Sequence, residues 1–563
     1  MPSQPPLPKI CIALGFPTVE KLIAHARAEV ESGEQFLEFR LDYLKNPIDG
    51  VSAISKFLRD NPDCTVLATC RRHQNHGKFD GSIAEQIRIL EASVDAGALA
   101  VDLEIESAEN AVDKLDRLRA DCMLIISYHN FEGTPPIEPV FKRMAKIQAY
   151  AYKIVTTARK PNDSYKMLSL AKSHPREKLV VLAMGEPGFS TRVLSPSFGG
   201  IYTYAAPNAA EGTASGQVSA RMLRHLYRVD KFTKNAKVYG VVADPVRHSI
   251  SPNVHNRAFQ HKRMDAVYLP FLVHSNQLKD FFQMAHDLPL SGASITIPHK
   301  QKVLRYLDVV EPLARRIGAV NTIWRKAGKW RGTNTDAEGV TAPLQKQLKL
   351  NKSTALIVGN GGAARGAAFA LADAGAKISL VGRNLDRVRA LSRICNGEPL
   401  SREQANARKF DIVVHCTPMG MWPNVDECFF EGKIPGELVF DMVYNPRETA
   451  LLRRAKAQGR QTIDGLAMFL EQAARQFEIF TGENAPRSSR STDTKFVLPL
   501  AYMRRRDLAW FLLAAPPAAS QTNTTTAAED LTAAKERVKT NSSELAKFAI
   551  PISTEPAFVF KAY

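Results

Sequence analysis

The stretch that decides the fold is Ala355–Arg387, ALIVGNGGAARGAAFALADAGAKISLVGRNLDR. An apolar run, Ala355–Val358, leads into a glycine-rich turn formed by Gly359, Asn360, Gly361, Gly362 and Ala363. A helix-forming segment and a second β-rich run, Lys377–Val381, follow. This order of strand, tight turn, helix and strand predicts half of a dinucleotide-binding unit, in which glycines let a pyrophosphate approach the start of the helix. We therefore expect the turn to bind a cofactor.

The end of the second strand favours NADP over NAD. An NAD site places an acidic residue about 20 residues after the glycines, where it accepts from the ribose 2′-hydroxyl. This chain instead has Gly382, Arg383 and Asn384 there, followed by Arg387. Two guanidinium groups suit a 2′-phosphate, so we predict that Arg383, Asn384 and Arg387 bind NADP. The alternative is a pair of solvated arginines at the start of a helix.

Composition limits the partners that we expect. The chain has 563 residues, enough for more than one core, and a net charge of +18 (75 basic minus 57 acidic). It lacks a long Lys/Arg tract and zinc-ligand spacing, so we expect anionic small molecules, no nucleic acid and no metal. The apolar run Leu508–Ala519 is too short to span a bilayer, so we expect no membrane. No secretory pattern and no CxxC among seven cysteines predict a reduced, cytoplasmic protein.

Short β-rich runs alternate with helical stretches through the first 230 residues. The runs are Lys9–Leu14, Leu37–Asp42, Thr65–Cys70, Ala100–Ile105, Met123–His129, Tyr150–Thr157, Leu179–Met184 and Gly200–Ala206. Amphipathic segments at Thr18–Ser32, Ala84–Ala96 and Ala108–Ala120 are predicted helices between them. This count and spacing predict a (β/α)₈ barrel, with a doubly wound sheet as the alternative.

Polar residues at the strand ends of such a barrel carry its chemistry. Lys153 interrupts an apolar strand, which predicts either an ion-paired barrel lysine or an imine-forming nucleophile. For the second role the amine must be neutral, and burial and neighbouring guanidinium groups favour that form. His129, one strand earlier, is placed to move a proton. The remaining strand-end residues include arginines that predict a carboxylate substrate: Glu38, Arg40, Asp42, Arg71, Arg72, Glu104, Arg192 and Gln217.

These residues resemble type I 3-dehydroquinate dehydratase, and the resemblance covers nearly all of residues 9–228. It implies an imine between Lys153 and the ketone of 3-dehydroquinate, with His129 as general acid and base. It also implies substrate contacts at Glu38, Arg40, Arg71, Arg192, Thr213 and Gln217. One position departs from the family, which usually has a glutamate that orients the histidine where this chain has Asn75. Asn75 can hydrogen-bond His129 but cannot stabilise its charged form, which bears on the rate rather than on the reaction.

A second set of motifs follows a polar linker at Lys231–Lys237. Ser249 and Ser251 lie on a strand-to-helix turn, where their hydroxyls can hold a carboxylate or simply cap the helix. Lys300, Asn321 and Asp336 each follow a short apolar strand. Beside an NADP site, these three suggest polyol recognition and proton transfer that accompanies hydride transfer.

This second set closely resembles shikimate dehydrogenase over about residues 238–486. The resemblance implies that Lys300 donates and accepts the proton, with Asp336 as its partner. It implies substrate contacts at Ser249, Ser251, Thr296, Asn321, Tyr444 and Gln472. On the cofactor side it adds Thr417, Met442 and Gly465 to the glycine-rich turn.

Together the resemblances imply an α/β chain in which an N-terminal (β/α)₈ TIM barrel (residues 1–230) precedes a two-lobed dehydrogenase. Its shikimate-binding lobe is expected at 237–345, and its Rossmann NADP-binding lobe with a returning C-terminal helix at 350–486. Residues 487–563 are unassigned and predicted to be flexible, with one amphipathic helix at Ala527–Lys547. We hypothesise a bifunctional type I 3-dehydroquinate dehydratase/shikimate dehydrogenase, since the first reaction makes the substrate of the second. The alternatives are a ligand-sensing regulator on the same folds, or an aldolase-type barrel joined to a quinate dehydrogenase.

Overall fold

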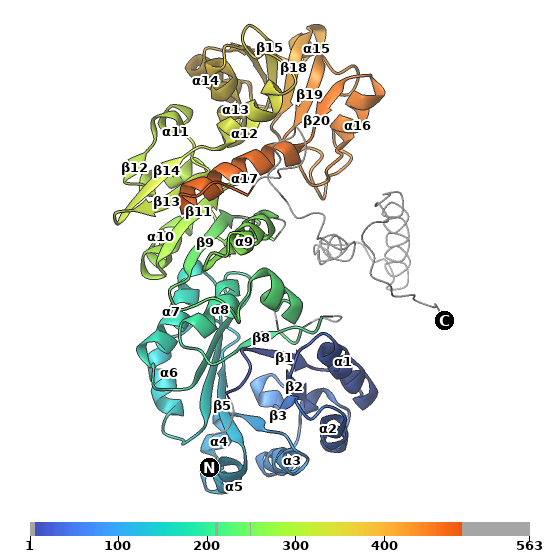
Figure 1. The fold of residues 1–563 in the computed structure, drawn as a ribbon, viewed down its shortest axis with the longest axis vertical. Helices are drawn as coiled ribbons and strands as arrows, with labels where there is room; N and C mark the ends of the chain where they lie inside the picture. The colour runs from blue at the N-terminus through green and yellow to red at the C-terminus, as the bar shows by residue number, and fades with distance from the viewer. Residues whose placement is uncertain (1–5, 209–211, 215, 248, 487–563) are drawn as a thin grey trace. The chain divides into compact units, whose positions relative to one another are not determined.

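Three β-sheets organise the described part of the chain (Figure 1). The structure is a computed structural model that describes residues 6–208, 212–214, 216–247 and 249–486. The tail predicted at 487–563, with its helix at Ala527–Lys547, lies outside the described residues. Within the described ranges, no helix has both the length and the apolar character needed to cross a membrane.

The first sheet is a nearly closed parallel barrel. Its eight strands follow the order β7-β6-β5-β4-β3-β2-β1-β8, and a bridge between Leu179 and Gly200 joins the two ends. The predicted (β/α)₈ barrel is therefore confirmed, and the doubly wound alternative is wrong for this part of the chain. The strands are β1 (Ile10–Leu14), β2 (Phe36–Arg40), β3 (Thr65–Thr69), β4 (Ala100–Glu104), β5 (Met123–His129), β6 (Ala151–Thr157), β7 (Leu179–Met184) and β8 (Thr203–Ala205). The helices are α1 (Val19–Glu31), α2 (Asp49–Asp60), α3 (Ile83–Asp95), α4 (Ile105–Glu109), α5 (Asp116–Asp121), α6 (Ile137–Met144), α7 (Pro161–Ser173) and α8 (Phe189–Leu194).

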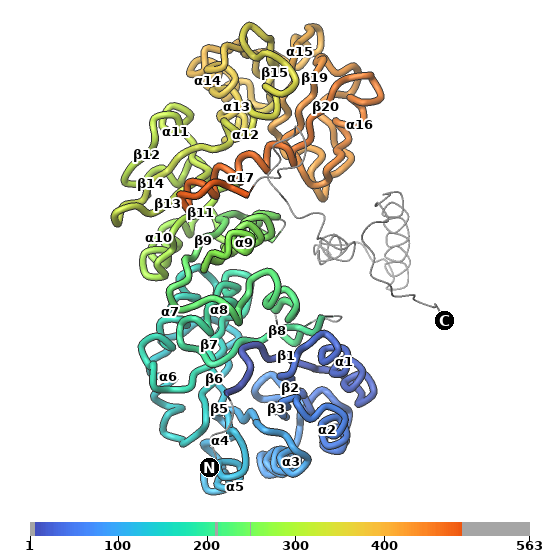
Figure 2. Tube along the Cα trace, viewed as in Figure 1, coloured from blue at the N-terminus to red at the C-terminus, as the bar shows by residue number. Residues whose placement is uncertain are grey.

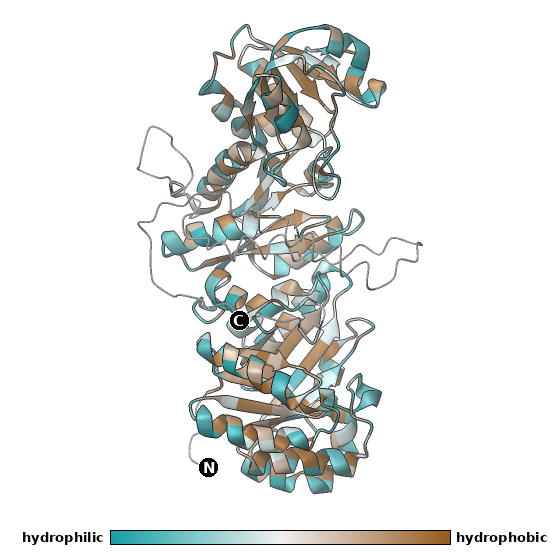
Figure 3. Ribbon diagram, turned by 90° about the vertical axis from the view of Figure 1, so that its right-hand side faces the viewer, coloured by the Kyte–Doolittle hydropathy of each residue, from teal (hydrophilic) through white to brown (hydrophobic). Residues whose placement is uncertain are grey.

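Hydrophobic strands and amphipathic helices explain this arrangement (Figure 3). Alternate residues of each strand face either the barrel interior or the helices, so both faces are buried and the strands are apolar almost throughout. The single helix predicted at Ala108–Ala120 is wrong, because α4 and α5 are separate. Asn110 donates from Nδ2 to the Glu106 carbonyl at 2.7 Å, and Ala111 leaves the helical region with φ −146°.

The second sheet is mixed and has the order β10-β9-β11-β13-β14-β12. β9, β10 and β11 are parallel, whereas β13 runs antiparallel to both β11 and β14. Its elements are β9 (Lys237–Ala243), α9 (Ser251–His261), β10 (Ala266–Leu272), α10 (Leu278–Asp287), β11 (Leu290–Ile295), β12 (Val309–Val310), α11 (Pro312–Ile317), β13 (Thr322–Lys326), β14 (Lys329–Thr333) and α12 (Asp336–Gln345).

The third sheet is entirely parallel, with the order β17-β16-β15-β18-β19-β20. The strand order reverses between β15 and β18, and this switch point is where doubly wound sheets bind nucleotides. The predicted Rossmann arrangement is thus confirmed. The elements are β15 (Thr354–Val358), α13 (Gly362–Asp373), β16 (Lys377–Val381), α14 (Leu385–Cys395), β17 (Glu398–Pro399), α15 (Arg402–Ala407), β18 (Phe410–His415), β19 (Gly436–Asp441), α16 (Ala450–Ala457), β20 (Gln461–Ile463) and α17 (Gly465–Thr481). Helix α17 returns from the third sheet to contact strands β11 and β13 of the second sheet and the neighbouring helix α12 (Figure 2).

Candidate active sites

Lys153 projects into the barrel and is surrounded by acidic and phenolic groups. Its side chain is 4% exposed, and its Nζ lies 2.6 Å from Asp102 Oδ2, 3.0 Å from the Tyr204 hydroxyl and 3.6 Å from Glu38 Oε1. Guanidinium groups were expected next to this amine, and that expectation is wrong, because the groups in contact with Lys153 Nζ are two carboxylates and a phenol. Glu38 and Asp102 occupy inward-facing positions of β2 and β4, so carboxylates meet the lysine at the same depth of the barrel.

His129 ends β5 and meets the side chain of Arg71. Arg71 Nη1 lies 2.9 Å from His129 Nε2. Because a guanidinium group can only donate, Nε2 is the acceptor and the imidazole is neutral, with its hydrogen on Nδ1. Burial, together with the positive charges of Arg71 and Lys153, holds the pKa of His129 well below its usual range. A neutral imidazole in this position can accept a proton.

The arginines predicted to bind substrate lie at the same end of the barrel. Arg71 Nη2 is also 3.3 Å from Asp102 Oδ1, whereas Arg40 binds both oxygens of Asp42 at 2.9 and 2.8 Å. Arg192, on α8, is 2% exposed, and burial lowers its pKa to about 10. Several cations close to an open strand end can attract a carboxylate.

Thr213 and Gln217 follow β8 and approach the same strand ends. A Cβ atom on Gly15, just after β1, would lie 2.8 Å from Thr213 Cγ2, so the segment packs closely against the barrel rim. Gln217 Oε1 accepts from the Ala214 backbone N–H at 3.3 Å. The fold therefore brings all six predicted substrate contacts of the barrel to one end.

The second predicted site is centred on Lys300 and Asp336. Lys300 Nζ lies 2.5 Å from Asp336 Oδ2, and Asn321 Nδ2 donates to Asp336 Oδ1 at 2.8 Å. Asn321 Nδ2 also lies 3.1 Å from Gln472 Oε1, on the returning helix α17. Four residues that are distant in sequence thus form one hydrogen-bonded network.

The other predicted substrate residues also follow strands. Ser249 and Ser251 follow β9, Thr296 follows β11, and Tyr444 follows β19 of the third sheet. Ser249 Oγ accepts from the Ser251 backbone N–H at 3.3 Å, next to the start of α9, so Ser249 does make a cap-like contact. Thr296 directly follows β11, and its backbone N–H donates to the Val242 carbonyl at 3.1 Å. Tyr444 packs on Phe469 with ring centroids 5.2 Å apart, and burial raises its pKa to about 12.

The glycine-rich turn lies beside both Thr417 and Lys300. Gly359 has φ +126°, a conformation that favours glycine, and a Cβ atom there would lie 3.3 Å from Thr417 Cγ2. A Cβ atom on Gly362 would lie 3.3 Å from Lys300 Cβ and Cδ. Since α13 begins at Gly362, its free backbone N–H groups face a space in which a pyrophosphate can approach.

The residues predicted around the rest of the cofactor also fit NADP. Asn384 caps α14 by accepting from the Arg387 N–H at 3.0 Å, which fixes the turn after β16. Arg383 and Arg387 are exposed, and within the described ranges neither forms an ion pair with a carboxylate. Two guanidinium groups are therefore available to a 2′-phosphate. Met442 and Gly465 meet at the start of α17, where a Cβ atom on Gly465 would lie 2.6 Å from the Met442 carbonyl.

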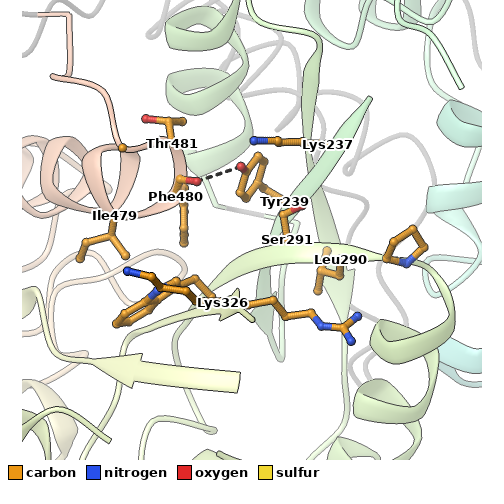
Figure 4. A pocket seen from close by; sticks show the side chains of 12 residues that line it. Lys237, Tyr239, Leu290, Ser291, Lys326, Ile479, Phe480 and Thr481 are labelled. Carbon is orange, nitrogen blue, oxygen red and sulfur yellow. Dashed lines mark hydrogen bonds between the residues drawn. The ribbon is translucent and has the colours of Figure 1, made fainter. Parts of the chain in front are cut away.

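A separate pocket of about 500 Å³ lies away from these residues (Figure 4). It is lined by Lys237 and Leu290, which begin β9 and β11, and by the end of α17, where the Tyr239 hydroxyl donates to the Phe480 carbonyl at 2.9 Å. Ser249, Thr296 and Lys300 follow the opposite ends of the same strands. The pocket is therefore not the predicted substrate site.

Comparisons with known proteins cover both halves of the chain. The protein-family model of type I 3-dehydroquinase matches residues 10–234, and the family model of the shikimate dehydrogenase substrate-binding domain matches residues 241–323. The shikimate/quinate 5-dehydrogenase model matches 342–423, and the shikimate 5′-dehydrogenase C-terminal domain matches 465–489. A bifunctional 3-dehydroquinate dehydratase/shikimate dehydrogenase of Arabidopsis thaliana, described as chloroplastic, is 34% identical over 505 residues, covering 85% of this chain and 83% of that protein. The chain belongs to this bifunctional family.

Other relatives match one or both parts. The shikimate biosynthesis protein AroDE of Chlamydia pneumoniae is 31% identical over 383 residues, covering 68% of this chain and 78% of its own length. The shikimate dehydrogenase (NADP(+)) of Desulforamulus reducens is 40% identical over 266 residues, covering 44% of this chain and 91% of that enzyme. These relatives are described as biosynthetic enzymes, so they lend no support to the regulator alternative.

Reasoning from the sequence missed several residues of this family member's two sites. Asp102 and Tyr204 contact Lys153 directly, and neither was predicted as a site residue. In the Rossmann lobe, His415 Nδ1 lies 2.9 Å from Asp441 Oδ1, and its Nε2 lies 2.5 Å from the Thr417 hydroxyl. A signal was present for Asp102, since a carboxylate inside an apolar strand is as unusual as the lysine that was noticed.

Asn75 does not make the hydrogen bond to His129 of which its amide is capable. Asn75 Nδ2 donates to Glu106 Oε2 at 2.9 Å, and the Nε2 atom of His129 contacts Arg71 instead. The cause is local, because the 3₁₀ turn His73–Asn75 ends at His76 in the left-handed region (φ 59°) and directs Asn75 toward α4.

Proposed function

We propose that this chain catalyses two consecutive steps of the shikimate pathway. The barrel dehydrates 3-dehydroquinate to 3-dehydroshikimate, and the two-lobed part reduces that product to shikimate with NADPH. The observation that carries the proposal is the placement of two amines: Lys153 is buried among carboxylates in the barrel, and the partly buried Lys300 lies between Asp336 and the cofactor turn. Membership of the bifunctional family supports the same pair of activities.

In the barrel, Lys153 is proposed to attack the ketone carbon of 3-dehydroquinate and form an imine with loss of water. The protonated imine withdraws electrons from the adjacent carbon, whose hydrogen becomes acidic. Neutral His129 then removes that proton and returns it to the departing hydroxyl group. Arg71, Arg40 and Arg192 supply positive charge for the substrate carboxylate. Hydrolysis of the imine releases 3-dehydroshikimate and frees Lys153.

In the dehydrogenase, Lys300 is proposed to give a proton to the carbonyl oxygen as it becomes a hydroxyl. NADPH, when bound at the glycine-rich turn, supplies the hydride. Asp336 holds the lysine amine at 2.5 Å, and Asn321 donates to the other oxygen of Asp336. These contacts fix the position of the amine during the reaction. Ser249 and Ser251 are proposed to bind the substrate carboxylate, and Thr296, Asn321, Tyr444 and Gln472 its remaining polar groups.

The proposed limits of the functional parts are 1–230 for the dehydratase, 237–345 for the shikimate-binding lobe and 350–486 for the NADP-binding lobe. The proposed partners are these anionic metabolites rather than nucleic acid. A cytoplasmic location is also proposed, because all seven cysteines are free thiols, as a reducing compartment allows. Imaging of the tagged full-length chain in its own cell tests this location.

A coupled assay tests the whole proposal. Purified protein is mixed with 3-dehydroquinate and NADPH, and the nicotinamide absorbance is followed. Absorbance should fall, because the first product is the substrate of the second reaction. Oxidation of NADPH with 3-dehydroshikimate but not with 3-dehydroquinate would mean that the barrel is inactive, and no oxidation with either would contradict the dehydrogenase assignment.

Replacing Asn75 by Ala should leave dehydratase kcat within about threefold of wild type, because Asn75 binds Glu106 and not His129. His129→Ala is the comparison and should lower kcat by about 10²- to 10⁴-fold. Both are measured from the absorbance of 3-dehydroshikimate as it forms. A loss of more than tenfold in Asn75→Ala would show that this side chain does act on the histidine.

Removing both arginines of the proposed 2′-phosphate site should weaken NADPH binding selectively. In Arg383→Ala/Arg387→Ala, we expect KM for NADPH to rise at least about 100-fold, since each charge-assisted contact contributes about 1.5–3 kcal/mol. KM for NADH should change little, because NADH has no 2′-phosphate. Arg393 is exposed on α14, the helix that also carries Arg387, and it offers a control because Arg393→Ala should alter neither KM value. Equal losses with both cofactors would contradict the NADP assignment.

A further inference from the structure

The hydroxyl of Tyr204, on β8, bridges Lys153 and Glu38. It lies 3.0 Å from Lys153 Nζ and 3.2 Å from Glu38 Oε1, whereas the amine and the carboxylate are 3.6 Å apart. An ammonium group can only donate, and a phenol has one hydrogen to give. Tyr204 therefore accepts from Lys153 and donates to Glu38, which gives the chain of hydrogen bonds a single direction.

The phenol of Tyr204 is held in its protonated form. Burial and the charge of Glu38 raise the pKa of Tyr204 well above its usual value. The ring itself also lies under the amine, with Lys153 Nζ 4.6 Å from its centroid. A phenol of this kind can relay a proton by accepting one and releasing another, without becoming a phenolate.

Asp102 is closer to the lysine but is less suited to take its proton. Its Oδ1 also accepts from Ser127 Oγ at 2.7 Å and lies 3.3 Å from Arg71. Burial opposes the charge of Asp102, but Lys153, Arg71 and these hydrogen bonds outweigh burial and lower its pKa. Within the part of the chain that the structure describes, the side chains that donate hydrogen bonds to Glu38 Oε1 are neutral hydroxyls, those of Tyr204 at 3.2 Å and of Thr69 at 2.8 Å. Asp102 therefore anchors the amine, and Glu38 is the available acceptor.

We propose that Tyr204 is a catalytic residue of the dehydratase, which passes a proton from Lys153 to Glu38 before the amine attacks and passes it back afterwards. This inference rests on the proposed imine at Lys153. In the first step the ammonium group loses one proton to the Tyr204 oxygen while the phenol proton moves to Glu38. The neutral amine then bonds to the ketone carbon, whose π electrons move to oxygen, and a second proton shifts from nitrogen to that oxygen. Finally the Glu38 proton returns through Tyr204 to the hydroxyl group on the former ketone carbon, this group leaves as water with the C–O electrons, and the nitrogen lone pair completes the protonated imine.

Trapping of the imine with borohydride tests the relay. Each full-length variant is mixed with 3-dehydroquinate, quenched with borohydride at increasing times, and the adduct on Lys153 is measured by mass spectrometry. In Tyr204→Phe, which keeps the ring, the rate of adduct formation and the dehydratase kcat should fall about 100-fold, with KM nearly unchanged. Glu38→Gln should show a similar fall in the rate of adduct formation, because the amide can accept a hydrogen bond but cannot take up the proton.

Tyr152→Phe is the matched control, since Tyr152 is a buried tyrosine next to Lys153 on β6 whose ring packs on Phe141 of α6 and whose hydroxyl donates to the Ile147 carbonyl at 2.9 Å. It should stay within about threefold of wild type, and reduction of 3-dehydroshikimate should be unaffected in every variant. Wild-type adduct rates in Tyr204→Phe, or equal losses in Tyr204→Phe and Tyr152→Phe, would overturn the relay and leave the imine intact. If Tyr204→Phe fails to fold, a wild-type adduct rate in Glu38→Gln overturns it. Absence of any adduct in the wild type would instead refute the proposed function.

Discussion

Replacing Lys153 by Ala should lower dehydratase kcat by about 10⁴-fold or more and leave reduction of 3-dehydroshikimate unchanged. The expected loss is large because the variant cannot form the covalent intermediate, so the hydrogen next to the ketone keeps its ordinary low acidity. Formation of 3-dehydroshikimate measures the first activity and oxidation of NADPH the second. Borohydride with 3-dehydroquinate should also label the wild type at Lys153 and leave the variant unlabelled.

Lys172→Ala provides the control for this experiment, because Lys172 is an exposed lysine of α7 in the same barrel. It should keep both activities and the adduct on Lys153. A Lys153→Ala variant that still dehydrates 3-dehydroquinate at more than about a hundredth of the wild-type rate would rule out the imine mechanism. The intact dehydrogenase of the same chain shows that the protein was made and remains folded in that part.

Replacing Lys300 by Met should lower kcat for reduction of 3-dehydroshikimate by about 10³-fold. Methionine is an unbranched side chain only one atom shorter than lysine, but it cannot give a proton to the carbonyl oxygen, and it leaves Asp336 without its 2.5 Å partner. KM for NADPH should change little, because the proposed phosphate contacts come from backbone N–H groups and from Arg383 and Arg387. Oxidation of NADPH at saturating substrate gives kcat directly.

Lys302→Met is the matched control, since Lys302 lies two residues further along the chain and is exposed. It should retain full activity in both reactions. Should Lys300→Met keep more than about a tenth of the wild-type kcat, the proton must come from another group, and the Lys300–Asp336 pair would then serve only to bind substrate. The dehydratase activity should be normal in both variants.

The fold could be read from the sequence because hydrophobic periodicity and glycine placement are local signals. The runs around Lys153 and His129 alternate with amphipathic helices at the spacing of a barrel, and Gly359–Gly362 mark the first turn of a Rossmann unit. The helix predicted across Asn110 failed for an equally local reason, because a side chain that bonds its own backbone can end a helix without a proline or glycine.

The sites were only partly predictable, because sequence shows which residues end strands but not which side chains meet. Lys153 stood out as a charge in an apolar strand, yet its neighbours Asp102 and Tyr204 come from strands about 50 residues away on either side. The hydrogen bond of Asn75 with Glu106 depends on the left-handed backbone conformation of His76, which the sequence pattern does not predict. Contacts between side chains on different barrel strands depend on the geometry of the barrel, so they can be identified only from coordinates.

The close approach of Gly362 to Lys300 limits how this enzyme can be re-engineered. A methyl group at residue 362 would lie 3.3 Å from the lysine stem, so the turn proposed to bind pyrophosphate also packs against the side chain of the proposed acid–base lysine. Attempts to convert the coenzyme requirement by redesigning this loop would disturb proton delivery at the same time. The exposed positions 383 and 387 are free of that constraint, and they are where a switch to the cheaper coenzyme NADH should be sought.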